Sequence, residues 1–257
     1  MLSLLLTALV VGLSSIDTGH LAASLLSWQV APALALVAIL LPVFWWIEKR
    51  AVDPVIRPGL LRSRPVVTAY LIGTGVGAVQ SAGSFYPALA VAAIGVSQST
   101  ASWMLLPGVL GATIASPIAG RLINVIGTRL LVSTSMVLVV ISLLIFGFAD
   151  VGMATFIAAS VLGNIGMGGV LGAPLRLVIL ENSLPSERGS AQGLLSNFTS
   201  MGRLVGAAFV GSIAASAGGG VAGYQAALAG MAVVAVGMAA LALSLRSRSS
   251  APLPATS

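Results

Sequence analysis

The sequence predicts an all-α integral membrane protein, a bundle of about eight transmembrane helices. Only 7% of the 257 residues are charged and 58% are hydrophobic, whereas a soluble domain carries about 25% charged residues. Long apolar runs recur from one end of the chain to the other. The basic residues gather in alternate connections between these runs, as the positive-inside rule predicts for a multi-pass protein.

The apolar runs give the expected spans in order. Strands of an outer-membrane barrel alternate apolar and polar residues over about ten positions, whereas LVSTSMVLVVISLLIFGF is apolar on all sides. Helices are therefore predicted, and a helix needs about 20 residues to cross the hydrocarbon core. The expected spans cover residues 1–13, 28–47, 66–91, 101–119, 130–149, 153–180, 189–214 and 224–245.

The first run is short for a span and begins directly at Met1. A signal segment has a basic leading region, and MLSLLLTALVVGLSS contains no basic residue. We therefore expect a truncated transmembrane helix, with a signal segment as the alternative.

Eleven of the twelve basic residues lie in connections on one side of the predicted bundle. The alternate connections contain no lysine or arginine, so this side and both termini are predicted to be cytoplasmic. The predominance of arginine, alanine and valine is typical of a GC-rich bacterial genome, so the expected location is the bacterial cytoplasmic membrane. The net charge of +6 is then an orientation signal, and no nucleic-acid partner is expected.

The composition also argues against catalysis. The chain has no cysteine and one histidine, His20, so neither a zinc-thiolate site nor a histidine metal site is expected. The spans contain no pair of carboxylates and no G-x-S-x-G on a plausible element. An enzyme is therefore not predicted.

The connection between the fourth and fifth runs reads GRLINVIGTR and predicts a tight turn between antiparallel helices. It resembles the signature loop of the major facilitator superfamily, G-x-L-x-D-R-x-G-R-[KR]. In the family this loop helps to lock one conformation through charge pairs at a helix end. Asn124 replaces the loop's acid and cannot form an ion pair, so the resemblance implies a weakened latch. The signature-loop residues here are Gly120, Arg121, Asn124, Gly127 and Arg129.

The resemblance extends along nearly the whole chain. The stretch FWWIEKRAVDPVIRPGLLRSRP is similar to the segment before the second bundle of fourteen-helix drug:proton antiporters of the EmrB/QacA type. Residues 185–194 fit the pattern P-x-E-R-G-x-A-x-G-L, and Arg203 with Gly206 fits R-x-x-G. The ordered set resembles the C-terminal portion of that family.

The resemblance implies a domain plan. Residues 1–48 would be two linker transmembrane helices, the first truncated, and residues 49–65 a basic cytoplasmic loop. Residues 66–245 would form the C-terminal six-helix bundle, itself two inverted three-helix repeats, and residues 246–257 a disordered cytoplasmic tail. Its partners would be the lipid bilayer, a small-molecule substrate, and a missing N-terminal bundle or a separate partner half.

The activity implied is proton-coupled efflux of drugs or other small apolar or cationic compounds by alternating access. No cofactor is expected, because the proton gradient supplies the energy. The alternative is a truncated, non-transporting membrane protein, or an assembly partner that needs a separate N-terminal half.

Seven side chains in the spans are candidates for the substrate path. The charge of Arg203 within a span predicts either a cavity-facing role or an anchor bonded to carbonyls of a neighbouring helix. Uncharged polar groups there either face the substrate or bond between helices, and aromatic groups suit an apolar drug. The candidates are Gln80, Phe85, Tyr86, Met104, Asn164, Asn197 and Arg203.

Glycines spaced four residues apart let helix backbones approach closely. They predict internal packing, with homodimerisation as the alternative. The spaced pairs are Gly73 and Gly77, Gly168 and Gly172, and Gly202 and Gly206, and Gly166 is a further candidate for helix packing.

Overall fold

The computed structural model describes residues 63–244 and the isolated positions 32, 35–36, 39 and 42. The predicted linker helices, the basic loop up to residue 62 and the tail therefore lie outside the described segment. Within residues 63–244 the chain forms helices and no strand, which confirms the predicted all-α fold. Five stretches of this part are long and apolar enough to cross a membrane: Arg64–Ile94, Gln98–Phe148, Met153–Glu181, Pro185–Ser216 and Gly220–Ala242.

The first stretch is a broken helix. Helix α4 (Arg64–Ala82) leads into the 3₁₀ turn η3 (Gly83–Phe85) and then into α5 (Tyr86–Ile94). The break precedes Pro87, which has no backbone N–H and whose ring clashes with the carbonyl four residues earlier in a regular helix. Helix α5 ends at Gly95, whose φ of 76° is the left-handed conformation that commonly ends helices.

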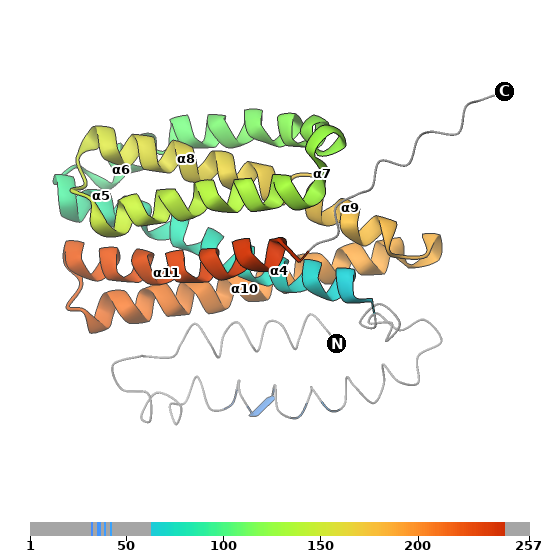
Figure 1. Cartoon of the computed structure of the whole chain (residues 1–257). Coiled ribbons are helices and arrows are strands. Elements are labelled where there is room, and N and C mark those ends of the chain that lie inside the picture. Colours follow the sequence, from blue (N-terminus) through green and yellow to red (C-terminus); the bar gives the residue numbers. More distant parts are fainter. Residues whose placement is uncertain (1–31, 33–34, 37–38, 40–41, 43–62, 245–257) are drawn as a thin grey trace.

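The second stretch contains two antiparallel arms. After the short α6 (Gln98–Trp103), helix α7 (Leu106–Phe148) is interrupted at Gly127, which has φ 78° and ψ 163°. This conformation is essentially confined to glycine, and the chain reverses there, so the two arms of α7 lie side by side (Figure 1). We call residues 106–126 the first arm and residues 128–148 the second arm. The reversal lies in the predicted signature loop.

The third stretch is also broken by a proline. Helix α8 (Met153–Leu171) ends at Gly172, and α9 (Pro174–Glu181) begins directly at its proline. A short 3₁₀ turn, η4 (Pro185–Glu187), then leads into the next long helix.

Two helices complete the chain. Helix α10 (Arg188–Ser216) and helix α11 (Gly220–Ala242) are joined by a tight turn, and the last of its three consecutive glycines is the first residue of α11. Gly218, Gly219 and Gly220 have φ values of 82°, 68° and 63°, so the turn needs a backbone that other residues adopt with difficulty.

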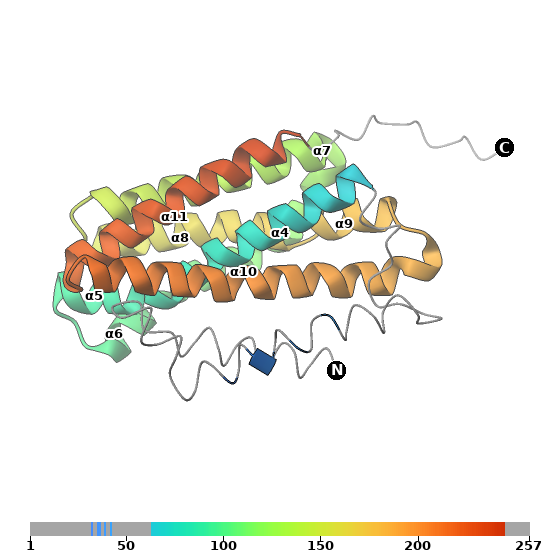
Figure 2. The ribbon, with the colours of Figure 1, turned by 90° about the horizontal axis from the view of Figure 1, so that it is seen from below.

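The elements run side by side, and their connections alternate between the two ends of the bundle (Figures 1 and 2). The start of α4, the Gly127 turn, the α9–α10 connection and the end of α11 lie at one end, which we call the turn end. All described connections that carry arginine lie there, whereas Asp150 lies in the connection at the other end. The charges are thus distributed as in a multi-pass membrane protein.

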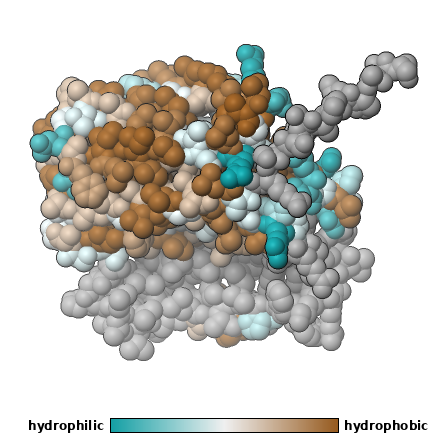
Figure 3. Space-filling model, in the orientation of Figure 1, coloured by the Kyte–Doolittle hydropathy of each residue, from teal (hydrophilic) through white to brown (hydrophobic). Residues whose placement is uncertain are grey.

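The surface agrees with a lipid environment. Apolar atoms cover most of the described face in Figure 3, and hydrophilic atoms gather mainly toward the turn end. Large apolar side chains stand exposed along the helices, including Ile114 at 60%, Val125 at 80% and Val233 at 73%. A soluble monomer rarely exposes so large a contiguous apolar surface.

The glycines singled out in the sequence lie where helices touch. A Cβ at Gly77 would fall on the carbonyl oxygen of Thr199, and a Cβ at Gly202 would fall on that of Thr74, so α4 and α10 meet backbone to backbone. Helix α8 meets both arms of α7 in a similar way. The close neighbours are Leu195 for Gly73, Ser135 for Gly166, Ala112 for Gly168, Ser116 for Gly172 and Ala78 for Gly206.

Candidate functional site: a polar pair between two cavities

Arg203 and Gln80 form a hydrogen bond between α10 and α4. The Nε of Arg203 donates to the Oε1 of Gln80 at 2.7 Å. The pair stands beside the closest contact of the two helices, because Gly202 precedes Arg203 and Gly77 lies one turn before Gln80. The intramembrane charge therefore bonds a side-chain amide of the neighbouring helix, and its own side chain is exposed.

Helix α10 carries further polar groups on the same side as Arg203. Ser196 and Ser200 are exposed and precede Arg203 by seven and three residues, which places all three on one helical face. Each serine donates to the carbonyl four residues earlier, to Gln192 and to Ser196 respectively. We call this surface the α10 polar face. It is unsuited to lipid, where polar groups normally face protein or a water-filled cavity.

A first cavity, of about 280 Å³, lies on the Gln80 side of the pair. The amide of Asn164 points its Nδ2 at the carbonyl of Ser160, 2.8 Å away on the same helix. The ring of Tyr86 stacks on Phe146 with centroids 4.4 Å apart, which fixes one wall. The lining residues are Val79, Gln80, Gly83, Ser84, Tyr86, Leu105, Val109, Val139, Gly163, Asn164 and Met167.

A second cavity, of about 250 Å³, lies on the Arg203 side between α8, α9 and α10. The Nε2 of Gln192 donates to the carbonyl of Arg176 at 2.9 Å and ties α10 to α9 at this point. Neither cavity is lined by a carboxylate or a histidine. The residues lining the second cavity are Leu171, Leu175, Arg176, Leu195, Ser196, Thr199, Ser200 and Arg203.

Four of the seven candidate substrate-path residues meet here: Gln80, Tyr86, Asn164 and Arg203. The other three line neither cavity. The ring of Phe85 turns toward Tyr224, with centroids 6.4 Å apart. Met104 belongs to the buried core, with 7% exposure, and Asn197 is half-buried on α10.

Several polar groups at the site did not stand out in the sequence. Ser84 lies within the 3₁₀ turn η3 and lines the first cavity, and Thr199 lines the second cavity together with the α10 polar face. A helical-wheel reading of the seventh run would have found Ser196, Ser200 and Arg203 together, because their spacing repeats every turn.

The signature turn lies apart from both cavities. Arg121, Asn124 and Arg129 are all exposed there. The turn itself, GRLINVIGTR, contains no carboxylate. The described residues also contain no group of three or more His, Cys, Asp and Glu side chains that could hold a metal ion.

The arrangement offers hydrogen-bonding groups within an apolar frame. Such a combination suits the binding of a small molecule with an apolar body and a few polar atoms. It provides no activated nucleophile and no acid–base pair among the lining residues.

Known proteins match the chain along most of its length. The chain is 27% identical over 190 residues to the multidrug transporter protein MdtP of Bacillus subtilis, covering 73% of the chain and 35% of that protein. It is 28% identical over 200 residues to the uncharacterized MFS-type transporter YfiU of the same organism, covering 76% and 38%. The multidrug resistance protein Stp of Mycobacterium tuberculosis is 26% identical over 176 residues, covering 68% and 33%.

The matched part thus covers between 33% and 38% of the length of these relatives. The family model described as Major Facilitator Superfamily matches residues 69–257, which is more than half of the chain. The match points to a transporter and not to an enzyme. It also indicates a multi-pass protein in a membrane. The chain therefore belongs to the major facilitator superfamily.

Proposed function

We propose that the chain is the C-terminal part of an exporter that moves small apolar or cationic compounds across the bacterial cytoplasmic membrane. The observation that carries the proposal is the Arg203–Gln80 pair, which stands between two cavities on an exposed polar face. The printed names of MdtP and Stp, a multidrug transporter and a multidrug resistance protein, support drugs as the substrate class.

The α10 polar face supports a larger assembly. A charged group at the centre of a bilayer costs several kcal/mol on most estimates, so such groups normally face a cavity or a partner. We place a second bundle, from outside residues 1–257 or from a separate partner half, opposite this face. Alternating access would then open the two cavities to one side of the membrane at a time.

The fourteen-helix arrangement belongs to this proposal. Residues 1–48 would supply two linker helices, residues 49–65 the basic loop and residues 66–245 the six-helix bundle. The turn end would be cytoplasmic, because the described connections with arginine lie there. The C-terminus would then be cytoplasmic too.

Energy would come from the proton gradient, without a bound cofactor. Neither cavity is lined by a carboxylate or a histidine, so we place the group that carries the proton outside residues 63–244. A cationic compound would likewise find its counter-charge outside this bundle, because Arg203 repels cations.

Efflux from inside-out membrane vesicles tests the proposal, using the complete reading frame that carries this sequence. Arg203→Ala should lower proton-driven efflux of a fluorescent drug at least tenfold, and Arg203→Lys should restore part of it, since the charge remains without the fixed guanidinium geometry. Arg188→Ala, at the exposed start of α10, is the matched control and should leave efflux unchanged.

Efflux by Arg203→Ala at the level of the unaltered protein, with equal amounts in the membrane, would overturn the role of the pair. If the unaltered reading frame itself exports no compound and confers no resistance, the result would favour the alternative of a non-transporting assembly partner.

A further inference from the structure

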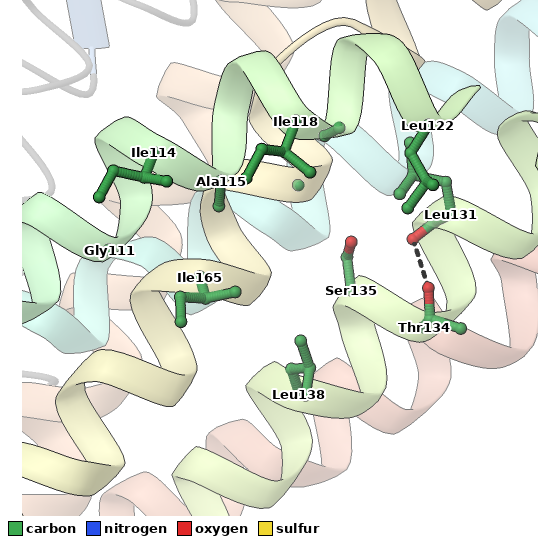
Figure 4. A pocket seen from close by; sticks show the side chains of 12 residues that line it. Gly111, Ile114, Ala115, Ile118, Leu122, Leu131, Thr134, Ser135, Leu138 and Ile165 are labelled. Atoms are coloured by element: carbon green, nitrogen blue, oxygen red, sulfur yellow. Dashed lines mark hydrogen bonds between the residues drawn. The ribbon is translucent and has the colours of Figure 1, made fainter. Parts of the chain in front are cut away.

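A groove lies between the two arms of α7 and α8, on the outside of the bundle and away from the α10 polar face. Its volume is about 370 Å³. Figure 4 shows that Ile114 and Ile118 of the first arm line one side, Leu138 of the second arm another and Ile165 of α8 the floor, with Leu122 and Leu131 at one end. We call it the arm groove.

The arm groove is open and apolar along its length. Ile114 is 60% exposed and Ile118 is 54% exposed. The polar groups in it are occupied or sheltered: the hydroxyl of Thr134 donates to the carbonyls of Leu130 and Leu131 at 2.9 and 3.0 Å, and Ser135 is buried. The groove therefore offers an occupant only apolar contacts.

The dimensions of the arm groove fit one lipid chain. From Gly111 to Leu122 the first arm rises by ~16 Å at 1.5 Å per residue, which is about half of a hydrocarbon core of about 30 Å. The length of the groove thus matches an acyl chain that lies within one leaflet.

Two arginines mark the end of the groove. Arg121 directly precedes Leu122, and Arg129 precedes Leu131 by two residues, so both stand at the turn end. Both are exposed, and Asn124 stands in the loop instead of the acid found in the related signature. The residues between the two arginines, 122–128, include no carboxylate, so two positive charges stand at this end of the groove.

We propose that the arm groove binds one acyl chain of an anionic phospholipid from the leaflet at the turn end, and that Arg121 and Arg129 hold its phosphate. Basic pockets between transmembrane helices commonly recognise anionic headgroups, and guanidinium groups suit phosphate oxygens geometrically. The groove length sets the chain at the depth of one leaflet. The bound lipid would brace the two arms where Gly127 joins them.

Native mass spectrometry of the purified full-length protein tests the site. The protein is stripped with detergent and then exposed to phosphatidylglycerol or phosphatidylcholine. We expect R121Q/R129Q to retain at least fivefold less phosphatidylglycerol than the unaltered protein. R64Q/R188Q also removes two positive charges at the turn end, but away from the groove. This variant should retain as much phosphatidylglycerol as the unaltered protein.

A second pair of variants tests the groove itself. Ala115→Phe fills the arm groove and should also lower retention of phosphatidylglycerol, whereas Val125→Phe, at an exposed position outside it, should not. Inorganic phosphate should not compete with the lipid, because it lacks the chain. Equal retention by R121Q/R129Q and R64Q/R188Q, equal retention by the two phenylalanine variants, or displacement by phosphate would each overturn the proposal.

Discussion

Helices α4 and α10 pack through close backbone contacts at glycines, as α8 does with the arms of α7. The first region nevertheless has a polar outer surface and the second an apolar one. In both, a glycine lets one backbone touch the next: Gly202 against Thr74 in the first region and Gly168 against Ala112 in the second. The first region carries the charge of Arg203 outward. The second presents isoleucine and leucine around the arm groove.

The difference separates packing from function in this bundle. Within lipid the hydrophobic effect does not hold helices together, so small residues and close contact do so in both regions. The side chains that point away from the contact then decide what the region meets. A polar face is stable in contact with protein or water, whereas an apolar groove is stable in contact with lipid.

The largest expected effect comes from disturbing the closest contact. Gly202→Ala puts a Cβ onto the carbonyl oxygen of Thr74, and a backbone atom cannot move aside without separating α4 from α10. We expect the free energy of unfolding to fall by about 3 kcal/mol, at the upper end of the usual cost of overpacking. Titration with a denaturing detergent, followed by circular dichroism, measures it.

Gly193→Ala is the matched control on the same helix, because a Cβ there meets no atom within 4 Å. It should leave stability unchanged or raise it by up to about 1 kcal/mol through helix propensity. Equal losses for the two variants would contradict the backbone contact.

The second effect tests how the arms of α7 reverse. Gly127→Ala forces a side chain into a backbone region with φ 78° and ψ 163°, at a cost of about 2 kcal/mol. Gly120→Ala, in the regular part of the first arm with no atom within 4 Å of its Cβ, should cost nothing. Thermal unfolding in mild detergent compares them. A Gly127→Ala protein as stable as Gly120→Ala would show that the reversal does not depend on this conformation.

Hydropathy and charge alone predict much of this fold, because each span must satisfy its backbone within one helix. The six runs from residue 66 onward correspond to the helical stretches, and the Gly127 reversal lies in the connection expected from its glycines. The breaks at Gly83–Phe85 and before Pro174 were not predicted. A proline in an apolar run predicts that the helix is interrupted there. It does not predict whether the chain after the interruption continues in nearly the same direction.

The site was harder to predict, because it depends on contacts between distant residues. Arg203 could be singled out as a charge within a span, but its partner could not, since 123 positions separate it from Gln80. Phe85 and Met104 have the right chemistry for an apolar cavity, yet packing turns the first toward Tyr224 and the second into the core. The residue type defines the chemistry of a side chain, but the packing of the helices decides which way that side chain points.

The third effect asks how strongly the polar pair joins α4 to α10. A double-mutant cycle with Gln80→Leu and Arg203→Met should give a coupling of about 1 kcal/mol, because hydrogen bonds between helices in a membrane are modest. Stability measured for the two single variants and the double variant gives this coupling. A coupling energy near zero would mean that the hydrogen bond between Gln80 and Arg203 does not stabilise the packing of α4 against α10.

The smallest effect concerns two serines of the second arm. The hydroxyl of Ser142 donates to the carbonyl of Ala159 on α8 at 2.7 Å, whereas the buried hydroxyl of Ser133 has no partner. Ser142→Ala should therefore lower stability by about 0.6 kcal/mol, the average for such bonds. Ser133→Ala should leave stability unchanged or raise it, because it removes an unsatisfied group. Ser142 also shares a side-chain hydrogen bond with Tyr86, so equal losses for the two variants would mean that the hydrogen bonds of Ser142 add nothing to the packing of α8 against the second arm.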